Sequence, residues 1–170
     1  VSARPIGVFD SGLGGLTVLR SMIDLLPGEP MLYFGDTGRF PYGPKPHDEV
    51  LKYALEIADI LVARDAKLLV VACNSATSVA LDVLRERLDI PVVGVIEPGL
   101  RAAARASRTG RIGVIGTVGT VASGSIPAEV SSILLATGSV GSEMLTTFPP
   151  QTNRFSHRDK CVSSFQCWLI

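Results

Sequence analysis

Short apolar runs alternate with longer amphipathic stretches over the first two-thirds of the chain. Five runs rich in Val, Ile, Leu and Phe predict β-strands, at residues 6–9, 31–34, 68–72, 91–95 and 111–115. Between them, apolar residues recur at the spacing of one helix face. This spacing predicts helices at about 16–26, from about 47, at about 75–88 and at about 100–107.

The run at residues 68–72 is apolar without alternation, which is typical of a central parallel strand covered on both faces. Strands and helices follow each other with short connections. We therefore predict an α/β fold with a parallel sheet flanked by helices. Such sheets bind ligands at the carboxyl ends of their strands.

The pattern changes after about Gly124. Charged residues become sparse, and no period of 2 or 3.6 is sustained beyond a short apolar run at residues 133–135. Without a periodic apolar face, residues 126–170 are predicted to be a poorly ordered tail.

Composition limits the classes of partner. Apolar residues make up 46% of the chain, and 16 basic residues balance 16 acidic ones, so no excess charge indicates nucleic acid or an anionic membrane. No apolar run reaches the ~18 residues that span a bilayer, and we expect no signal peptide. Three cysteines do not form a disulfide framework, which favours a reducing, cytoplasmic location.

Polar side chains follow three of the predicted strands. These candidate site residues are Asp10, Ser11, Cys73, Asn74, Ser75 and Thr117. Because the carboxyl ends of parallel strands share one edge of a sheet, we expect these side chains to converge on one small molecule.

Cys73 lies where a buried strand passes into a helix. The positive end of the helix dipole there favours a thiolate, but a buried and inert cysteine is an equally common occupant of such a position. Asn74 and Ser75 place hydrogen-bonding groups at the helix start, where they could hold a carboxylate or simply cap the helix.

Asp10 follows the first strand and precedes a glycine-rich turn at residues 12–15. Its carboxylate could bind an ammonium group or orient a proton carrier, although capping of the turn is the more common role. The turn lacks the spacing of a dinucleotide-binding motif and the Gly-Lys-Ser/Thr of a phosphate loop, so it indicates nucleotide binding only weakly.

The loop at residues 41–44, Pro-Tyr-Gly-Pro, is either a lid that offers backbone groups to a ligand or an ordinary turn. We expect His47 to mark a helix start. Cys161 and Cys167 have no neighbouring metal-type residues, so we predict no metal site.

Six segments together resemble the glutamate racemases of the aspartate/glutamate racemase superfamily. They lie in the family's order at residues 7–18, 34–37, 41–44, 71–76, 91–98 and 112–117. The resemblance implies two similar α/β domains that face each other across a cleft. Residues 1–97 would form the first domain, residues 98–125 would begin the second, and residues 126–170 diverge.

The resemblance also implies a reaction without a cofactor or metal. One cysteine thiolate removes the α-proton of glutamate, and a second cysteine returns a proton on the opposite face. Cys73 matches the first cysteine, which is expected to serve D-glutamate, and Asp10 assists the proton transfer. The matching substrate contacts are Asp10, Ser11, Tyr42, Gly43, Asn74, Ser75 and Thr117. The family supplies D-glutamate for peptidoglycan and forms homodimers.

The second cysteine block of the family, of the Gly-Cys-Thr-His type, does not occur in this sequence. A frameshift, a mis-joined reading frame or a truncation would produce such a pattern. Four functions therefore stay open: a glutamate racemase, a racemase-like fragment without turnover, an aspartate racemase relative, and a phosphate-binding module. Phosphate binding has no use for Cys73, which favours a racemase.

Overall fold

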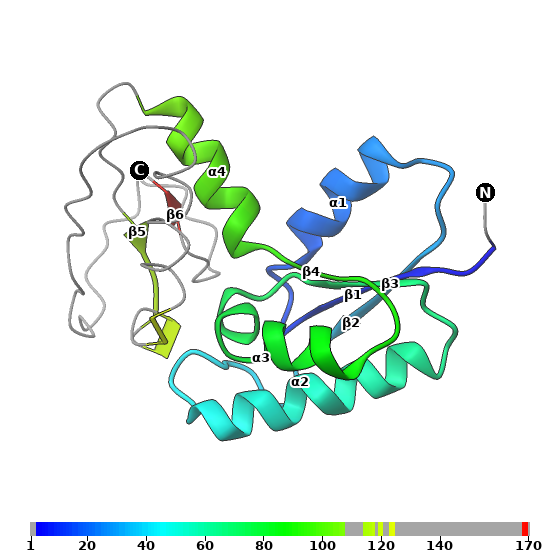
Figure 1. Ribbon diagram of the computed structural model, residues 1–170, viewed down its shortest axis with the longest axis horizontal. Coiled ribbons are helices and arrows are strands. Elements are labelled where there is room, and N and C mark those ends of the chain that lie inside the picture. The colour runs from blue at the N-terminus through cyan, green and yellow to red at the C-terminus, as the bar shows by residue number, and fades with distance from the viewer. Residues whose placement is uncertain (1–2, 108–113, 118, 121–122, 125–167, 170) are drawn as a thin grey trace.

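The structure, a computed structural model, describes residues 3–107, 114–117, 119–120, 123–124 and 168–169 (Figure 1). Four parallel strands form one sheet in the order β2-β1-β3-β4. They are β1 (Ile6–Asp10), β2 (Met31–Gly35), β3 (Leu68–Val71) and β4 (Val92–Gly94). Each coincides with a predicted run, and the predicted parallel sheet is confirmed.

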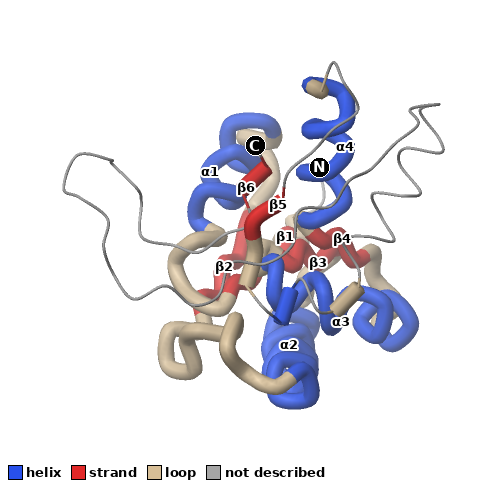
Figure 2. The backbone as a smooth tube through the Cα atoms, turned by 90° about the vertical axis from the view of Figure 1, so that its left-hand side faces the viewer, coloured by secondary structure: helices blue, strands red, loops and turns tan. Residues whose placement is uncertain are grey.

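Helices cover both faces of this sheet. They are α1 (Leu16–Leu25), α2 (His47–Val62) and α3 (Asn74–Arg87), and a further helix, α4 (Ile96–Ala106), follows β4. Figure 2 shows α2 and α3 on one side of the sheet and α1 on the other. The helix α4 begins four residues before its predicted start, because Pro98 lies in its first turn, where the missing N–H has no helical partner to lose. The predicted domain boundary between residues 97 and 98 falls inside this helix.

The strand register aligns the carboxyl ends of the strands. Phe9 pairs with both Phe34 of β2 and Val71 of β3. Asp10 is therefore the last residue of its strand at the edge where the chain leaves β3 toward Cys73. Asp10 and Cys73 lie at the same edge of the sheet, as the sequence predicts.

Two clusters of apolar side chains hold the helices on the sheet. The larger one lies between the sheet and α2 and α3, and includes Phe9, Leu61, Leu84, Tyr42 and Cys73. The smaller one lies toward α1 and has four buried residues, Ile6, Val8, Val70 and Ala72. Val18, Leu19 and Met22 of α1 pack against it while remaining partly exposed.

The predicted fifth strand does not extend the parallel sheet. Its described part, β5 (Val114–Ile115), pairs antiparallel with β6 (Trp168–Leu169). Figure 1 shows α4 leading away from the sheet toward this pair. Residues 125–167, including the short run at 133–135 and most of the predicted tail, lie outside the described residues. Among the described helices, none is long and apolar enough to cross a membrane.

Candidate active site

A cavity of about 170 Å³ opens at the carboxyl edge of the sheet. Its wall contains all eight residues that the sequence predicts for the site: Asp10, Ser11, Tyr42, Gly43, Cys73, Asn74, Ser75 and Thr117. Gly14, Phe40, Pro41, Pro44 and Thr120 complete the wall. Drug-sized ligands occupy cavities of roughly 300 Å³ or more, so this one suits a small metabolite such as an amino acid.

Asp10 holds the glycine-rich turn. Its buried carboxylate accepts hydrogen bonds through Oδ2 from the backbone N–H groups of Gly12, at 3.2 Å, and Gly15, at 3.0 Å. A Cβ atom on Gly15 would lie 2.7 Å from the Cβ of Asp10, so only glycine lets the turn approach so closely. The capping role is therefore present, and it presents the carboxylate to the cavity at the same time.

Tyr33, which sequence reasoning missed, supports this turn from β2. Its hydroxyl donates to the carbonyl of Gly12 at 3.0 Å. Burial, followed by the negative charges of Asp10 and Cys73, raises the pKa of Tyr33. Since a tyrosine inside a strand is an ordinary β-sheet residue, the sequence carries no signal for this role.

Cys73 is 6% exposed and lies directly before α3, as its N-cap residue, two positions after the end of β3. Its thiol donates to the hydroxyl of Ser11 at 3.5 Å. Burial raises the pKa of Cys73, and the charge of Asp10 raises it further, although hydrogen bonds with Ser11 and with the backbone of Ala76 lower it. Of the two expectations for Cys73, the buried thiol fits the protein without ligand, because burial is the largest influence on its pKa.

Three hydroxyl groups line the cavity beside the thiol. Thr120 lies 2.9 Å from Thr117 and 3.2 Å from Ser75, and Ser75 lies 3.5 Å from Thr117, measured between the hydroxyl oxygens. Thr120 is buried, and the sequence analysis missed it. Thr117 lies on the cavity wall although β5 is outside the parallel sheet, so the shared edge of the sheet does not account for its position.

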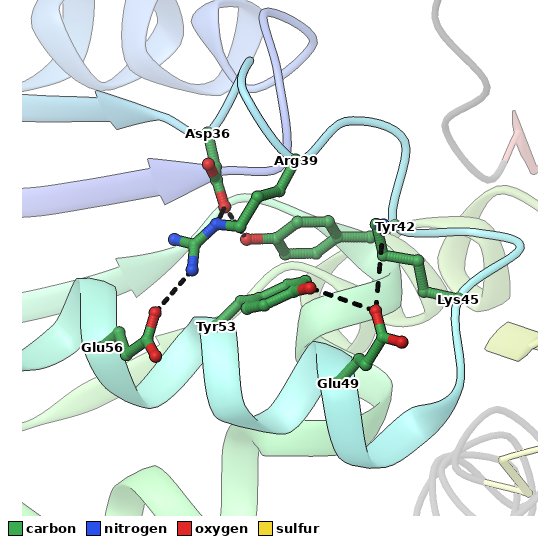
Figure 3. A network of polar contacts seen from close by, with 7 residues as sticks. All are labelled: Asp36, Arg39, Tyr42, Lys45, Glu49, Tyr53 and Glu56. Carbon is green, nitrogen blue, oxygen red and sulfur yellow. Dashed lines mark hydrogen bonds and ion pairs between the residues drawn. The ribbon is translucent and has the colours of Figure 1, made fainter.

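Tyr42 lies on the cavity wall, but its side chain is bonded within the protein. Its hydroxyl donates to Asp36, so its polar end is already occupied inside the protein (Figure 3). Burial, followed by the bond to Asp36, raises the pKa of Tyr42. The loop at residues 40–44 therefore presents ring edges and backbone to the cavity. At Gly43 a Cβ atom would lie 2.6 Å from Cγ2 of Thr117, so glycine allows this close contact.

His47 is the first residue of α2, as predicted. Its ring Nε2 lies 3.1 Å from the carbonyl oxygen of Gly119, outside the cavity wall. The described residues contain no cluster of His, Cys, Asp and Glu that could hold a metal ion.

The arrangement can act on a small amino acid. A thiol next to a carboxylate can exchange a proton with a bound ligand, and the neighbouring hydroxyls and the start of α3 can hold a carboxylate. Because the thiol is buried, a proton transfer here would proceed with little competition from water.

Comparison with known proteins agrees with this geometry. The family model described as Asp/Glu/Hydantoin racemase matches residues 6–158. The chain is 60% identical over 103 residues to the glutamate racemase of Corynebacterium kroppenstedtii, a match covering 61% of this chain and 36% of that protein.

Two solved structures are also similar. The chain superposes on a glutamate racemase of Bacillus anthracis with a TM-score of 0.76 and 46% identity, over 83% of this chain and 53% of that one. The glutamate racemase of Francisella tularensis, solved with D-glutamate, gives a TM-score of 0.73 at 33% identity, over 85% of this chain and 53% of that one. The chain thus spans between about a third and about a half of the length of these relatives. The chain belongs to the Asp/Glu/Hydantoin racemase family.

Proposed function

We propose that this chain binds glutamate in the cavity and serves a glutamate racemase as the half of the active site that carries Cys73. The observation that carries the proposal is the buried thiol of Cys73 on the wall of a small cavity, with Asp10, Ser11 and the hydroxyl cluster around it. The similarity to glutamate racemases supports the same reading.

The reaction that we propose is a proton transfer. The thiolate of Cys73 takes the α-proton, so Sγ becomes S–H and the α-carbon keeps the electron pair as a carbanion. Donors placed in advance around the ligand's carboxylate stabilise this charge. The hydroxyls of Ser75, Thr117 and Thr120, with Asn74 at the start of α3, are the candidates for that role.

The raised pKa of Cys73 fits a site that is activated by its ligand. Without ligand, burial and Asp10 keep the thiol protonated at neutral pH. An amino acid brings an ammonium group, and a positive charge near the thiol and Asp10 would favour the thiolate. The base would then form chiefly when the substrate is in place.

Inversion also requires a proton carrier on the opposite face of the α-carbon. The other cysteines of this sequence are Cys161 and Cys167, both outside the described residues, and neither lies in a Gly-Cys-Thr-His block. We therefore expect the chain on its own to exchange the α-proton of one enantiomer, D-glutamate, and to invert glutamate negligibly.

Glutamate is favoured over aspartate as the substrate. The relatives reported above are glutamate racemases, and one of the similar structures was solved with D-glutamate. By the same similarity we propose that the protein acts in the cytoplasm and supplies D-glutamate for peptidoglycan. We also propose that it forms a homodimer. Its first domain would span residues 1–97, and its second would begin at residues 98–125.

The test is incubation of the chain with D-glutamate, L-glutamate and D-aspartate in heavy water, followed by mass spectrometry and chiral chromatography. We expect deuterium at the α-carbon of D-glutamate without inversion, lost in Cys73→Ser and kept in Cys161→Ser and Cys167→Ser. Wild-type levels of exchange in Cys73→Ser would refute the role of this thiol. Full inversion that needs Cys161 or Cys167 as well would refute the one-sided site.

A further inference from the structure

The loop at residues 40–44 forms one side of the cavity, and its position depends on charged residues outside the cavity. Figure 3 shows Arg39, directly before the loop, between the end of β2 and the helix α2. Its Nε donates to Oδ2 of Asp36 at 2.6 Å, and its NH1 donates to Oε2 of Glu56 at 2.5 Å. One guanidinium group therefore ties the start of the loop to a helix that is distant in sequence.

Aromatic stacking fixes the same side chain. The guanidinium carbon of Arg39 lies 4.2 Å from the centre of the Tyr53 ring, and the Tyr53 ring lies 5.7 Å from that of Tyr42. Arg39 thus bonds to two carboxylates and contacts an aromatic face at the same time. This combination requires a planar group with several donors, which the side chain of lysine does not provide.

The link from Arg39 to the cavity passes through Asp36 and Tyr42. The Oδ2 atom of Asp36 that accepts from Arg39 also accepts from the hydroxyl of Tyr42. Tyr42 is 1% exposed and belongs to the same buried cluster as Cys73. If Asp36 loses its cation, its buried carboxylate is left as an uncompensated charge. The carboxylate can then turn toward solvent, and it no longer fixes the Tyr42 hydroxyl and the ring beside the thiol.

We propose that Arg39 is a positioning residue of this site: by fixing Asp36 and Tyr42 it holds the loop at residues 40–44 beside Cys73. Arg39 does not line the cavity, so it acts only through the residues that do. Two consequences follow. The loop limits access to the thiol in the protein without ligand, and it preorganises the wall against which the ligand binds. Only the second consequence rests on the proposed function.

The first measurement uses the full chain without ligand. Iodoacetamide labels Cys73, and peptide mass spectrometry separates this site from Cys161 and Cys167. We expect Arg39→Ala to speed labelling of Cys73 by about tenfold or more, since a charge-assisted network is lost, and Arg39→Lys to restore only part of the protection. Tyr42→Phe should show a smaller increase.

A matched control separates positioning from a general loss of stability. Arg87 donates to both carboxylate oxygens of Asp59, at 2.9 and 2.8 Å, and joins α3 to α2 away from the cavity. Arg87→Ala should leave labelling of Cys73 within about twofold of wild type, as for a surface ion pair. Rates are compared at low urea concentrations where they do not depend on urea, so that labelling of unfolded protein is excluded.

The pH profile adds a readout that a merely structural residue would not move. Burial is the main cause of the raised pKa of Cys73, so a displaced loop should shift the midpoint of labelling in folded Arg39→Ala down toward the ordinary value of 9.0. An unchanged rate and midpoint in Arg39→Ala would overturn the proposal, as would equal changes in Arg87→Ala.

Protection by glutamate tests the second consequence. D-glutamate should slow labelling of wild type, and about fivefold or more ligand should be needed for the same protection in Arg39→Ala, since a preorganised wall lowers the cost of binding. If neither enantiomer protects wild type, the proposed function fails, whereas the rates without ligand still decide the role of Arg39.

Discussion

Side chains on the two faces of the sheet are buried to different extents. On the side of α2 and α3, large side chains such as Phe9, Leu61 and Leu84 are removed from solvent, and Cys73 belongs to the same cluster. On the side of α1, no residue of the helix is buried. Apolar α1 residues remain more than 40% exposed on that side, among them Leu16, Ile23 and Leu25.

This difference separates the part that stabilises the fold from the part that supports the turn. The side of α2 and α3 supplies the apolar surroundings that keep the thiol of Cys73 protonated. The side of α1 contributes chiefly the glycine-rich turn that holds Asp10. Four predictions test this division, beginning with the largest expected effect.

Leu61→Ala should lower the free energy of unfolding by about 2–5 kcal/mol, because Leu61 is fully buried and its removal leaves a cavity. The matched change on the other side, Leu25→Ala, should cost less than about 0.5 kcal/mol, since Leu25 is 79% exposed. Urea denaturation followed by circular dichroism measures both. Similar losses in the two variants would contradict the comparison.

Gly15→Ala should cost about 1–3 kcal/mol although it lies on the side of α1. The added Cβ would lie 2.7 Å from the Cβ of Asp10 and 3.0 Å from that of Ala72, and neither atom can move without the backbone. Gly28→Ala is the control, because nothing lies within 4 Å of its added Cβ. If both variants unfold at the wild-type urea concentration, the turn is looser than the structure indicates.

The stability of the protein should depend on the ionisation of Cys73. The folded thiol keeps its proton more firmly than the unfolded one, so its stabilising contribution is complete below pH 9.0 and is lost as the pH rises from there through the raised folded value. Each unit of difference between folded and unfolded pKa contributes about 1.4 kcal/mol. Denaturation of wild type and Cys73→Ser between pH 7 and pH 11 should show a steeper decline for wild type. Parallel curves would mean that the thiol is not desolvated.

Ser11→Ala should have the smallest effect. The hydroxyl of Ser11 accepts from the thiol and can turn to donate to the thiolate, and this second bond lowers the pKa of Cys73, so its removal should raise that pKa further. Since the contact is long, at 3.5 Å, labelling below the midpoint should slow by less than about tenfold. Iodoacetamide labelling between pH 7 and pH 10 measures it. Faster labelling at neutral pH would show that Ser11 shields the thiol more than it favours the thiolate.

The sequence alone determined the sheet, its helices and the placement of Asp10 and Cys73 at the same edge of the sheet. Buried strands and amphipathic helices have different apolar periods, and a parallel arrangement brings strand ends to one edge, so local patterns were sufficient for these features. The same patterns did not predict the partner of β5, which pairs with residues more than fifty positions away. They also did not predict the start of α4, because a proline in the first turn resembles a break.

Only the tertiary structure decided the chemical state of the site. Whether Cys73 is a thiol or a thiolate depends on how much water and charge surround it, and the sequence position left both readings open. Thr120 and Tyr33 join the site through contacts between segments that are separate in the sequence. The hydroxyl of Tyr42 points to Asp36, a partner within the same loop that the apolar pattern does not indicate. Periodicity reports which face of an element is buried, whereas burial depth and hydrogen-bond partners are set by how the elements pack together.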